Sequence, residues 1–387
     1  MRGEWLVRAF VSRSGEISDP KVRQGYGVLE GWVSILINIV VFVVKLVPGI
    51  VIGSVALVAD AFHSLSDVVT SVVVIVGFWL SARPSDPKHP FGHGRAESVA
   101  SLVIAALLFL TAWEFGQASV ERLLRPRAIA APWWLIAVLV VSIVLKEWLS
   151  QFALALGKAI NSTALIGDFW HHRSDVFATA IVILALLASN VGLWWVDGLG
   201  GLAVSGIIAW AAWRLVPASI DPLIGDAPSP QLIAEVSGVA MSVPGVDSVH
   251  DVIVHRYGSL VVPSLHVEVS SRLGIEDGHE VAEEVEARLN RRYSSKAVVH
   301  VDPVDRSHPL YADVRTFLEE TVVRIPGANG FHDLRIVGSE RRPFILFDLS
   351  AEGDEAEAVA DRVREAVERR YPQAGKVGIN LRPRYVY

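Results

Sequence analysis

The sequence predicts an α-helical membrane domain with six transmembrane helices, followed by small α+β domains. Hydrophobic residues make up 52% of the 387 residues and charged residues only 20%, whereas soluble domains carry about 25% charged residues. Long apolar runs end near residue 225, and short apolar stretches then alternate with Glu, Asp and Arg. The soluble part also contains an internal repeat. These observations predict a membrane domain at 1–225 and soluble domains at 226–306 and 307–387.

Six segments are apolar over roughly the 20 residues that a helix needs to cross a bilayer. They are Gly27–Val47, Gly53–Leu80, Ser98–Val120, Pro132–Leu154, Leu165–Ala188 and Leu193–Val216. Basic residues gather in the N-terminal segment and in the loop after the second segment, although the loop after the third segment carries three arginines. Because cytoplasmic loops are enriched in Lys and Arg, we expect a multi-pass protein of the cell membrane with both termini in the cytoplasm.

The soluble part repeats one pattern. Residues Pro244–Asp251 resemble Pro326–Asp333, which lie 82 positions later. Each copy continues with two strand-like apolar runs, an acidic helix that ends in Arg-Arg-Tyr, and a final strand. The order helix–strand–strand–helix–strand predicts two small α+β domains in tandem, each with helices on one face of a sheet.

Composition excludes several classes of function. The chain contains no cysteine, so disulfides, thiolate metal sites and thiol catalysis are excluded. The net charge of −6 gives no indication of nucleic-acid binding.

Two of the apolar segments carry the same polar motif. The second contains His63-x-x-x-Asp67 and the fifth contains His171-x-x-x-Asp175. Residues i and i+4 share a face of a helix, so each helix presents an imidazole beside a carboxylate. Two such faces offer two nitrogens and two oxygens, which suits tetrahedral zinc, and two carboxylates neutralise a divalent cation.

The alternative for these motifs is a pair of structural hydrogen bonds between polar helix faces. Ionisable residues inside a membrane are costly and usually functional, and the same spacing occurs twice, so we favour a metal site. Asp60 and Asp168 each lie three residues before the histidine. They are candidates either for residues that orient the metal ligands or for positions on a helix interface.

A loop follows the second segment and holds Asp86, His89 and His93. One acid and two histidines within eight residues could form a second metal site, although a loop rich in Gly and Pro is often only a turn.

The first soluble repeat holds a third set of metal-binding residue types, scattered along the sequence: His250, His266, His279, His300 and Asp302. The second repeat aligns His332, Asp348, Asn380 and Arg382 with four of them. An arginine in place of Asp302 opposes a bound cation. We therefore expect metal binding in the first repeat and none in the second.

Over roughly residues 25–303, these motifs resemble the cation diffusion facilitator family of divalent metal/proton antiporters. The resemblance rests on His63-x-x-x-Asp67, His171-x-x-x-Asp175, the loop from His89 to Glu97 and the tail Val299–Pro303. It implies six helices in the lipid bilayer, cytosolic termini, a homodimer and a ferredoxin-like cytosolic domain.

The same resemblance assigns roles to single residues. It implies that the two His-x-x-x-Asp motifs form the transport site, that the loop residues form a second site, and that the five residues of the first soluble repeat form a cytosolic site that helps hold the dimer. It also implies a charge pair between Arg95 and Asp226 that ties the protomers together. The second soluble repeat departs from the family pattern, and two repeats in one chain could pack as an intrachain pseudo-dimer.

The predicted function is export of a divalent metal cation from the cytoplasm, with protons as the counter-ion. Zinc is the expected substrate and regulatory ligand; iron, cadmium, cobalt and manganese remain open because nitrogen–oxygen ligand sets accept them too. A membrane hydrolase would need an open metal position and a general base, and no His-Glu-x-x-His motif is present. We therefore do not expect an enzyme. A metal sensor or scaffold that does not transport is the alternative of another class.

Overall fold

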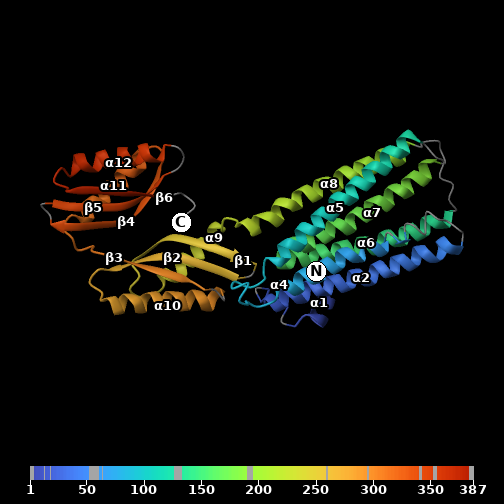
Figure 1. The fold of residues 1–387 in the computed structure, drawn as a ribbon, viewed down its shortest axis with the longest axis horizontal. Helices are drawn as coiled ribbons and strands as arrows, with labels where there is room; N and C mark the ends of the chain where they lie inside the picture. The colour runs from blue at the N-terminus through green and yellow to red at the C-terminus, as the bar shows by residue number, and fades with distance from the viewer. Residues whose placement is uncertain are drawn as a thin grey trace. The chain divides into compact units, whose positions relative to one another are not determined.

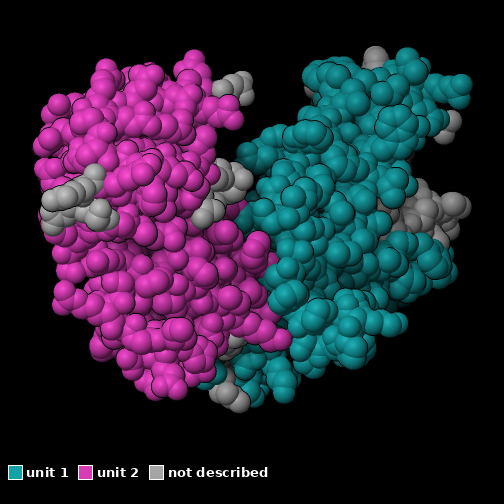
Figure 2. Space-filling view, turned by 60° about the vertical axis from the view of Figure 1, so that its left-hand side comes forward, with its two compact units in different colours: residues 1–226, 257–259 teal, residues 227–256, 260–387 magenta. Residues whose placement is uncertain are grey.

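The computed structural model describes residues 4–12, 14–17, 19–51, 61–62, 64–125, 133–189, 195–258, 260–293, 296–339, 342–351 and 355–382. The chain divides into two compact units. The first consists of residues 1–226 and 257–259, and the second of residues 227–256 and 260–387 (Figure 2).

The first unit is built from long helices that run alongside one another (Figure 1). The short helix α1 (Glu4–Phe10) comes first in the chain, followed by α2 (Pro20–Val51), α4 (Val68–Ser81), α5 (Ala96–Leu124), α6 (Trp133–Ile160), α7 (Thr163–Ser189) and α8 (Trp195–Ile224). The start of α2 has a clear cause. Asp19 accepts a hydrogen bond from the backbone N–H of Lys21 at 2.8 Å, and Pro20 has the fixed φ that suits a first helical position.

Five helical spans among the described residues are long and apolar enough to cross a membrane: Pro20–Pro48, Ser64–Ser81, Ala96–Leu124, Trp133–Ile160 and Gly198–Ile224. The predicted fifth segment is helix α7, which is 27 residues long. It carries Asp168, Arg173 and Asp175, which interrupt its apolar sequence. The helical membrane domain is thus confirmed, and α7 carries one of the two predicted motifs.

Several helix ends meet at one end of this bundle. Arg23 near the start of α2 forms an ion pair with Glu97 near the start of α5, with Nη2 3.0 Å from Oε2. The same arginine donates a hydrogen bond to the carbonyl of Ile160, the last residue of α6. A buried apolar core that includes Phe78, Leu149 and Phe152 holds the helices together.

The second unit contains two small sheets. The first repeat consists of α9 (Pro230–Met241), β1 (Ser248–Tyr257), β2 (Leu260–Ser270), α10 (Ile275–Tyr293) and β3 (Val298–Val304), with strand order β1-β2-β3. The second consists of α11 (Tyr311–Arg324), β4 (Ala328–Ser339), β5 (Arg342–Ala351), α12 (Ala356–Arg370) and β6 (Lys376–Arg382), with order β4-β5-β6. Each sheet has its own buried apolar core. The predicted α+β class and element order are therefore confirmed.

The strand registers match between the two repeats. His266 pairs with His300 across the parallel strands β2 and β3, and Asp348 pairs with Asn380 across the parallel strands β5 and β6. The tyrosine of each Arg-Arg-Tyr motif has the same role, because its hydroxyl donates a hydrogen bond to a carboxylate on the first helix of its own repeat. Tyr371 reaches Asp313 at 2.7 Å.

Candidate metal centre

Three of the four predicted membrane ligands lie together inside the helical unit. Asp67 is the residue immediately before α4, and His171 and Asp175 lie one turn apart on α7. His171 Nε2 is 3.5 Å from Asp67 Oδ1. His63, the fourth predicted ligand, and Asp60 lie outside the described residues. The structure therefore brings together one imidazole and two carboxylates from two different helices.

A lysine occupies the centre of this cluster. Lys146 on α6 places Nζ 2.8 Å from Asp67 Oδ2 and 2.7 Å from Asp175 Oδ2. The side chains of Lys146 and Asp67 are each only 4% exposed. Burying charges is tolerable only when opposite charges meet. The ammonium therefore balances part of the negative charge that a bound divalent cation would balance.

The three predicted loop residues also lie close together, between α4 and α5. His89 Nδ1 is 3.2 Å from Asp86 Oδ1, and His93 Nε2 is 3.5 Å from Asp86 Oδ2. The backbone N–H of His89 donates to the carboxylate of Asp86, which lowers the pKa of that carboxyl. One carboxylate and two imidazoles on a solvent-exposed loop are a ligand set that zinc accepts.

Four of the five residues predicted for the first soluble repeat form one cluster around Asp302. Its Oδ2 lies 2.8 Å from His266 Nδ1 and 3.3 Å from His250 Nε2, and its Oδ1 lies 3.3 Å from His300 Nε2. His279 is on the exposed face of α10, where it pairs with Glu283 one turn along the same helix at 3.3 Å.

The cluster shifts the pKa values of its own members. Burial alone would raise the pKa of Asp302, but hydrogen bonds from His250 and His266 outweigh burial and hold it far below its usual range. Burial alone would lower the pKa of His250, but its hydrogen bond to Asp302 and the charge of Glu268 raise it instead. The cluster therefore holds an ionised carboxylate among its histidines, and protons on those imidazoles would compete with a bound metal ion.

The corresponding positions of the second repeat make different contacts. Asn380 donates a hydrogen bond to Asp348 at 2.8 Å, so the amide satisfies the carboxylate that aligns with His266. The side chain of Arg382 is outside the described part of the chain. His332 points toward the first repeat, where its ring stacks on His250 with centroids 4.8 Å apart and its Nε2 lies 3.5 Å from Asp251 Oδ1.

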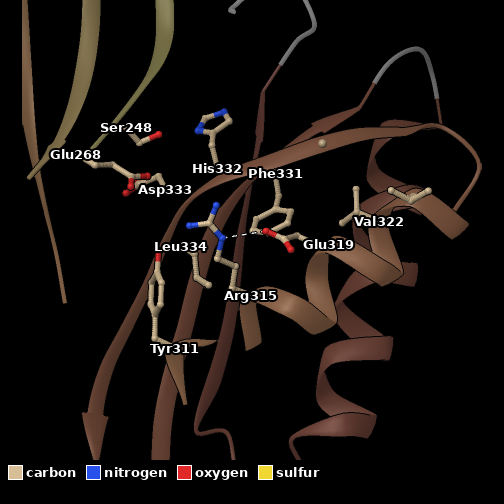
Figure 3. Close-up of a pocket in the computed structure, with 12 residues that line it drawn as sticks. Ser248, Glu268, Tyr311, Arg315, Glu319, Val322, Phe331, His332, Asp333 and Leu334 are labelled. Atoms are coloured by element: carbon tan, nitrogen blue, oxygen red, sulfur yellow. Dashed lines mark hydrogen bonds and ion pairs between the residues drawn. The ribbon is translucent and has the colours of Figure 1, made fainter. Parts of the chain in front are cut away.

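A cavity of about 340 Å³ opens beside this contact (Figure 3). Ser248 and Glu268 line it from the first repeat, and His332 and Asp333 line it from the second. Burial raises the pKa of Asp333 to about 6, against the opposing charge of Arg335. The two repeats thus meet through their matching His-Asp dipeptides.

The predicted charge pair involves two residues of the first unit. Arg95 is the residue immediately before α5, and Asp226 follows the end of α8. A pair that joins two protomers concerns a second copy of the chain and stays a prediction.

Three residues near these clusters were not predicted as site residues. Lys146 was visible as a charge in an apolar segment, and Asp251 as half of a dipeptide that the two repeats share. Asp251 offers an oxygen within 4.8 Å of ligand atoms of His250 and His266. Glu30 lies in an apolar segment too, and only the three-dimensional structure shows its partners.

Comparisons with known proteins fit both units. Residues 31–224 match the family model described as the cation efflux transmembrane domain. The model described as the cation efflux protein cytoplasmic domain matches twice, at residues 228–304 and 310–384. The double match supports the internal repeat.

Several relatives agree with these family models. An "uncharacterized transporter" of Methanocaldococcus jannaschii is 37% identical over 273 residues, which cover 70% of this chain and 96% of the relative. The cation-efflux pump FieF of Shewanella oneidensis is 28% identical, with 70% of this chain and 92% of the relative covered. The manganese efflux system protein MneP of Bacillus subtilis is 26% identical, with coverage of 70% and 94%.

The transmembrane and cytoplasmic family models together span most of the chain, and the relatives are cation transporters rather than enzymes. This chain therefore belongs to the cation diffusion facilitator family, as a multi-pass membrane protein that transports divalent metal cations.

Proposed function

We propose that this protein exports zinc from the cytoplasm in exchange for protons. The observation that carries the proposal is the convergence of Asp67, His171 and Asp175 inside the helical unit. With His63 as the fourth ligand, the site offers two nitrogens and two oxygens, and its two carboxylates neutralise a divalent cation. Four such ligands suit zinc, which prefers tetrahedral nitrogen and oxygen coordination.

Manganese is the second candidate substrate. One relative is named as a manganese efflux system protein, and carboxylate oxygens suit that ion. The imidazoles favour zinc over manganese, because borderline nitrogen donors bind zinc more tightly. Iron, cadmium and cobalt remain alternatives by the same mechanism.

Exchange against protons follows from the ligand chemistry. A metal ion binds neutral imidazole and ionised carboxylate, so its binding releases protons. Histidine titrates near neutral pH, and protons that enter from the opposite side can therefore displace the metal. The same site, exposed alternately to the two sides of the membrane, would couple inward proton movement to outward metal movement.

The soluble part is proposed to regulate this cycle. His250, His266, His279, His300 and Asp302 would bind zinc in the cytoplasm, and this site would help to hold a homodimer together. The contact between His250 and His332 supports packing of the two repeats as an intrachain pair. We retain the division at 1–225, 226–306 and 307–387, and we place both termini in the cytoplasm.

Metal flux into proteoliposomes tests the proposal. Purified protein is reconstituted and offered zinc, manganese, iron, cadmium and cobalt, with and without a pH gradient. We expect zinc flux to be fastest, and to accelerate when the destination compartment is acidic. Fastest flux with manganese would support the second candidate. A flux that is the same with and without the pH gradient would contradict proton exchange. Metal binding without transport of any metal would favour a sensor.

A further inference from the structure

A second cluster of ionisable residues lies in the helical unit, next to the transport-site residues His171 and Asp175. It contains Glu30 from α2 and Asp168 and His172 from α7, and all three side chains are fully buried. His172 Nε2 lies 3.2 Å from Asp168 Oδ2 and 4.0 Å from Glu30 Oε1. One possible ligand atom from each of the three residues lies within 4.8 Å of the other two.

The two carboxylates are not satisfied by their surroundings. Among the described residues, no donor with hydrogen-bond geometry reaches either oxygen of Glu30 or either oxygen of Asp168. Buried polar groups are hydrogen-bonded in the great majority of cases, and an ionised carboxylate in an apolar medium is especially costly. Apart from the ion pair between His172 and Asp168, these four oxygens have no hydrogen-bond partner among the described residues, and a cation between them would satisfy them.

The polar residues around the cluster orient the imidazole but supply no charge. Ser34 Oγ lies 3.0 Å from His172 Nε2 and 2.6 Å from Ser71 Oγ on α4. His172 carries at most one positive charge against two carboxylates. A divalent cation with two carboxylates and one neutral imidazole is electrically balanced, and this nitrogen–oxygen set is one that zinc and related divalent ions accept.

The cluster lies next to the transport site along α7. Asp168 is three residues before His171 and seven before Asp175. At 1.5 Å per residue, these separations are about 4.5 Å and about 10 Å along the helix axis. It is nearer the start of α7, where the helix follows directly on the end of α6. A cation bound there would lie next to the transport-site ligands that α7 carries, His171 and Asp175.

We propose that Glu30, Asp168 and His172 form a second intramembrane site for a divalent metal ion, adjacent to the transport site and distinct from it. The ion takes one oxygen from each carboxylate and Nε2 of His172, in place of the contact between that nitrogen and Ser34. Metal passes between this site and the transport site along α7.

Counting bound metal in the full-length protein tests the proposal. Purified protein in detergent is dialysed to equilibrium against zinc, and bound zinc is measured by elemental analysis. We expect Glu30→Gln with Asp168→Asn to lose one zinc per chain relative to wild type, and Asp67→Asn with Asp175→Asn to lose a different one. All four substitutions together should lose two. An unchanged zinc count in the Glu30 and Asp168 variant would overturn the second site. Loss of zinc in that variant, with none lost in the Asp67 and Asp175 variant, would support the second site and contradict metal binding at the transport site.

A second measurement uses only the wild-type protein, so it does not depend on the folding of the variants. Anomalous scattering at the zinc edge from wild-type crystals should show a peak about 2.0–2.2 Å from oxygens of Glu30 and Asp168 and from a nitrogen of His172. The absence of that peak at saturating zinc would mean that a shared proton, and not a metal, neutralises the carboxylates, and would overturn the proposal.

Discussion

Lys146 Nζ lies 2.8 Å from Asp67 Oδ2 inside the membrane-spanning helices. The same ammonium reaches Asp175 at 2.7 Å, so one tethered positive charge bridges the two carboxylates expected to bind the transported ion. A metal ion and the ammonium cannot both contact these oxygens at full strength. A bound metal ion would therefore compete with Lys146 for these two carboxylates, and the lysine should weaken metal binding.

Replacing the lysine should strengthen metal binding. In Lys146→Met the metal no longer competes with an ammonium, and we expect zinc affinity at the membrane site to rise by about tenfold, which corresponds to about 1.4 kcal/mol. The metal-free protein should also lose thermal stability, because removal of one partner leaves buried charge unpaired. Lys158→Met, an exposed position on the same helix, is the matched control. Affinity equal to that of the control would show that Lys146 does not compete with metal.

His63 is expected to set metal preference. His63→Asp replaces a nitrogen donor with a hard oxygen and adds negative charge, which favours cadmium or manganese relative to zinc. Transport should persist with a shifted order of metals, measured as flux across the same metal series. An identical order in wild type and variant would remove His63 from the selectivity of the site.

The second soluble repeat should bind no metal by itself. Asn380 already satisfies Asp348, and the position that aligns with Asp302 is an arginine. Calorimetry should give zinc binding for a fragment of residues 229–306 and none for a fragment of residues 307–387. Each fragment contains one apolar core, except that Val304 of the second core lies in the first fragment. His266→Ala in the first fragment should weaken its binding sharply. Tight stoichiometric zinc binding by the second fragment would point to an independent regulatory site.

Asp333 gives the soluble part a specific dependence on pH. Burial raises its pKa to about 6, above the value of about 3.9 in an unfolded chain. The folded state therefore binds the extra proton between these values, and stability falls as pH rises from about 4 to 6. Asp333→Asn removes the ionisable group and therefore this loss of stability with rising pH. Asparagine also tolerates the left-handed backbone at this position, where φ is 50°.

The stability of the variant relative to wild type should rise by about 1 kcal/mol between pH 4.5 and pH 8, since part of the shift of about two pKa units lies below pH 4.5 and solvent screening reduces the rest. Chemical denaturation of the fragment of residues 229–387 at both pH values measures the difference. A stability difference that is the same at pH 4.5 and pH 8 would refute the assignment.

Much of the fold was predictable because its signals are local. Apolar runs of membrane length, the spacing of His171 and Asp175, and the repeat with its Arg-Arg-Tyr helix ends can all be read along the chain. The strand registers agree with the alignment of the repeats, since His266 pairs with His300 as Asp348 pairs with Asn380.

The rest depends on which helices pack together, which the sequence does not state. Lys146 stood out as a charge in an apolar segment, but nothing local indicated that it reaches both Asp67 and Asp175. Glu30 meets residues of α7 that are more than 130 positions away. The stacking of His332 on His250 likewise depends on the packing of two repeats rather than on either repeat alone.

The central claim is that the cluster on α4 and α7 carries the transported metal. Asp67→Ala and Asp175→Ala each remove one oxygen ligand and one negative charge from it. Initial rates of zinc uptake into proteoliposomes, normalised to inserted protein, test the claim most directly, with Asp86→Ala in the exposed loop as the matched loss of a carboxylate. We predict uptake at the level of empty liposomes for both membrane variants and substantial uptake for the loop variant. Uptake at the wild-type rate by a correctly inserted Asp67→Ala or Asp175→Ala protein would contradict the claim.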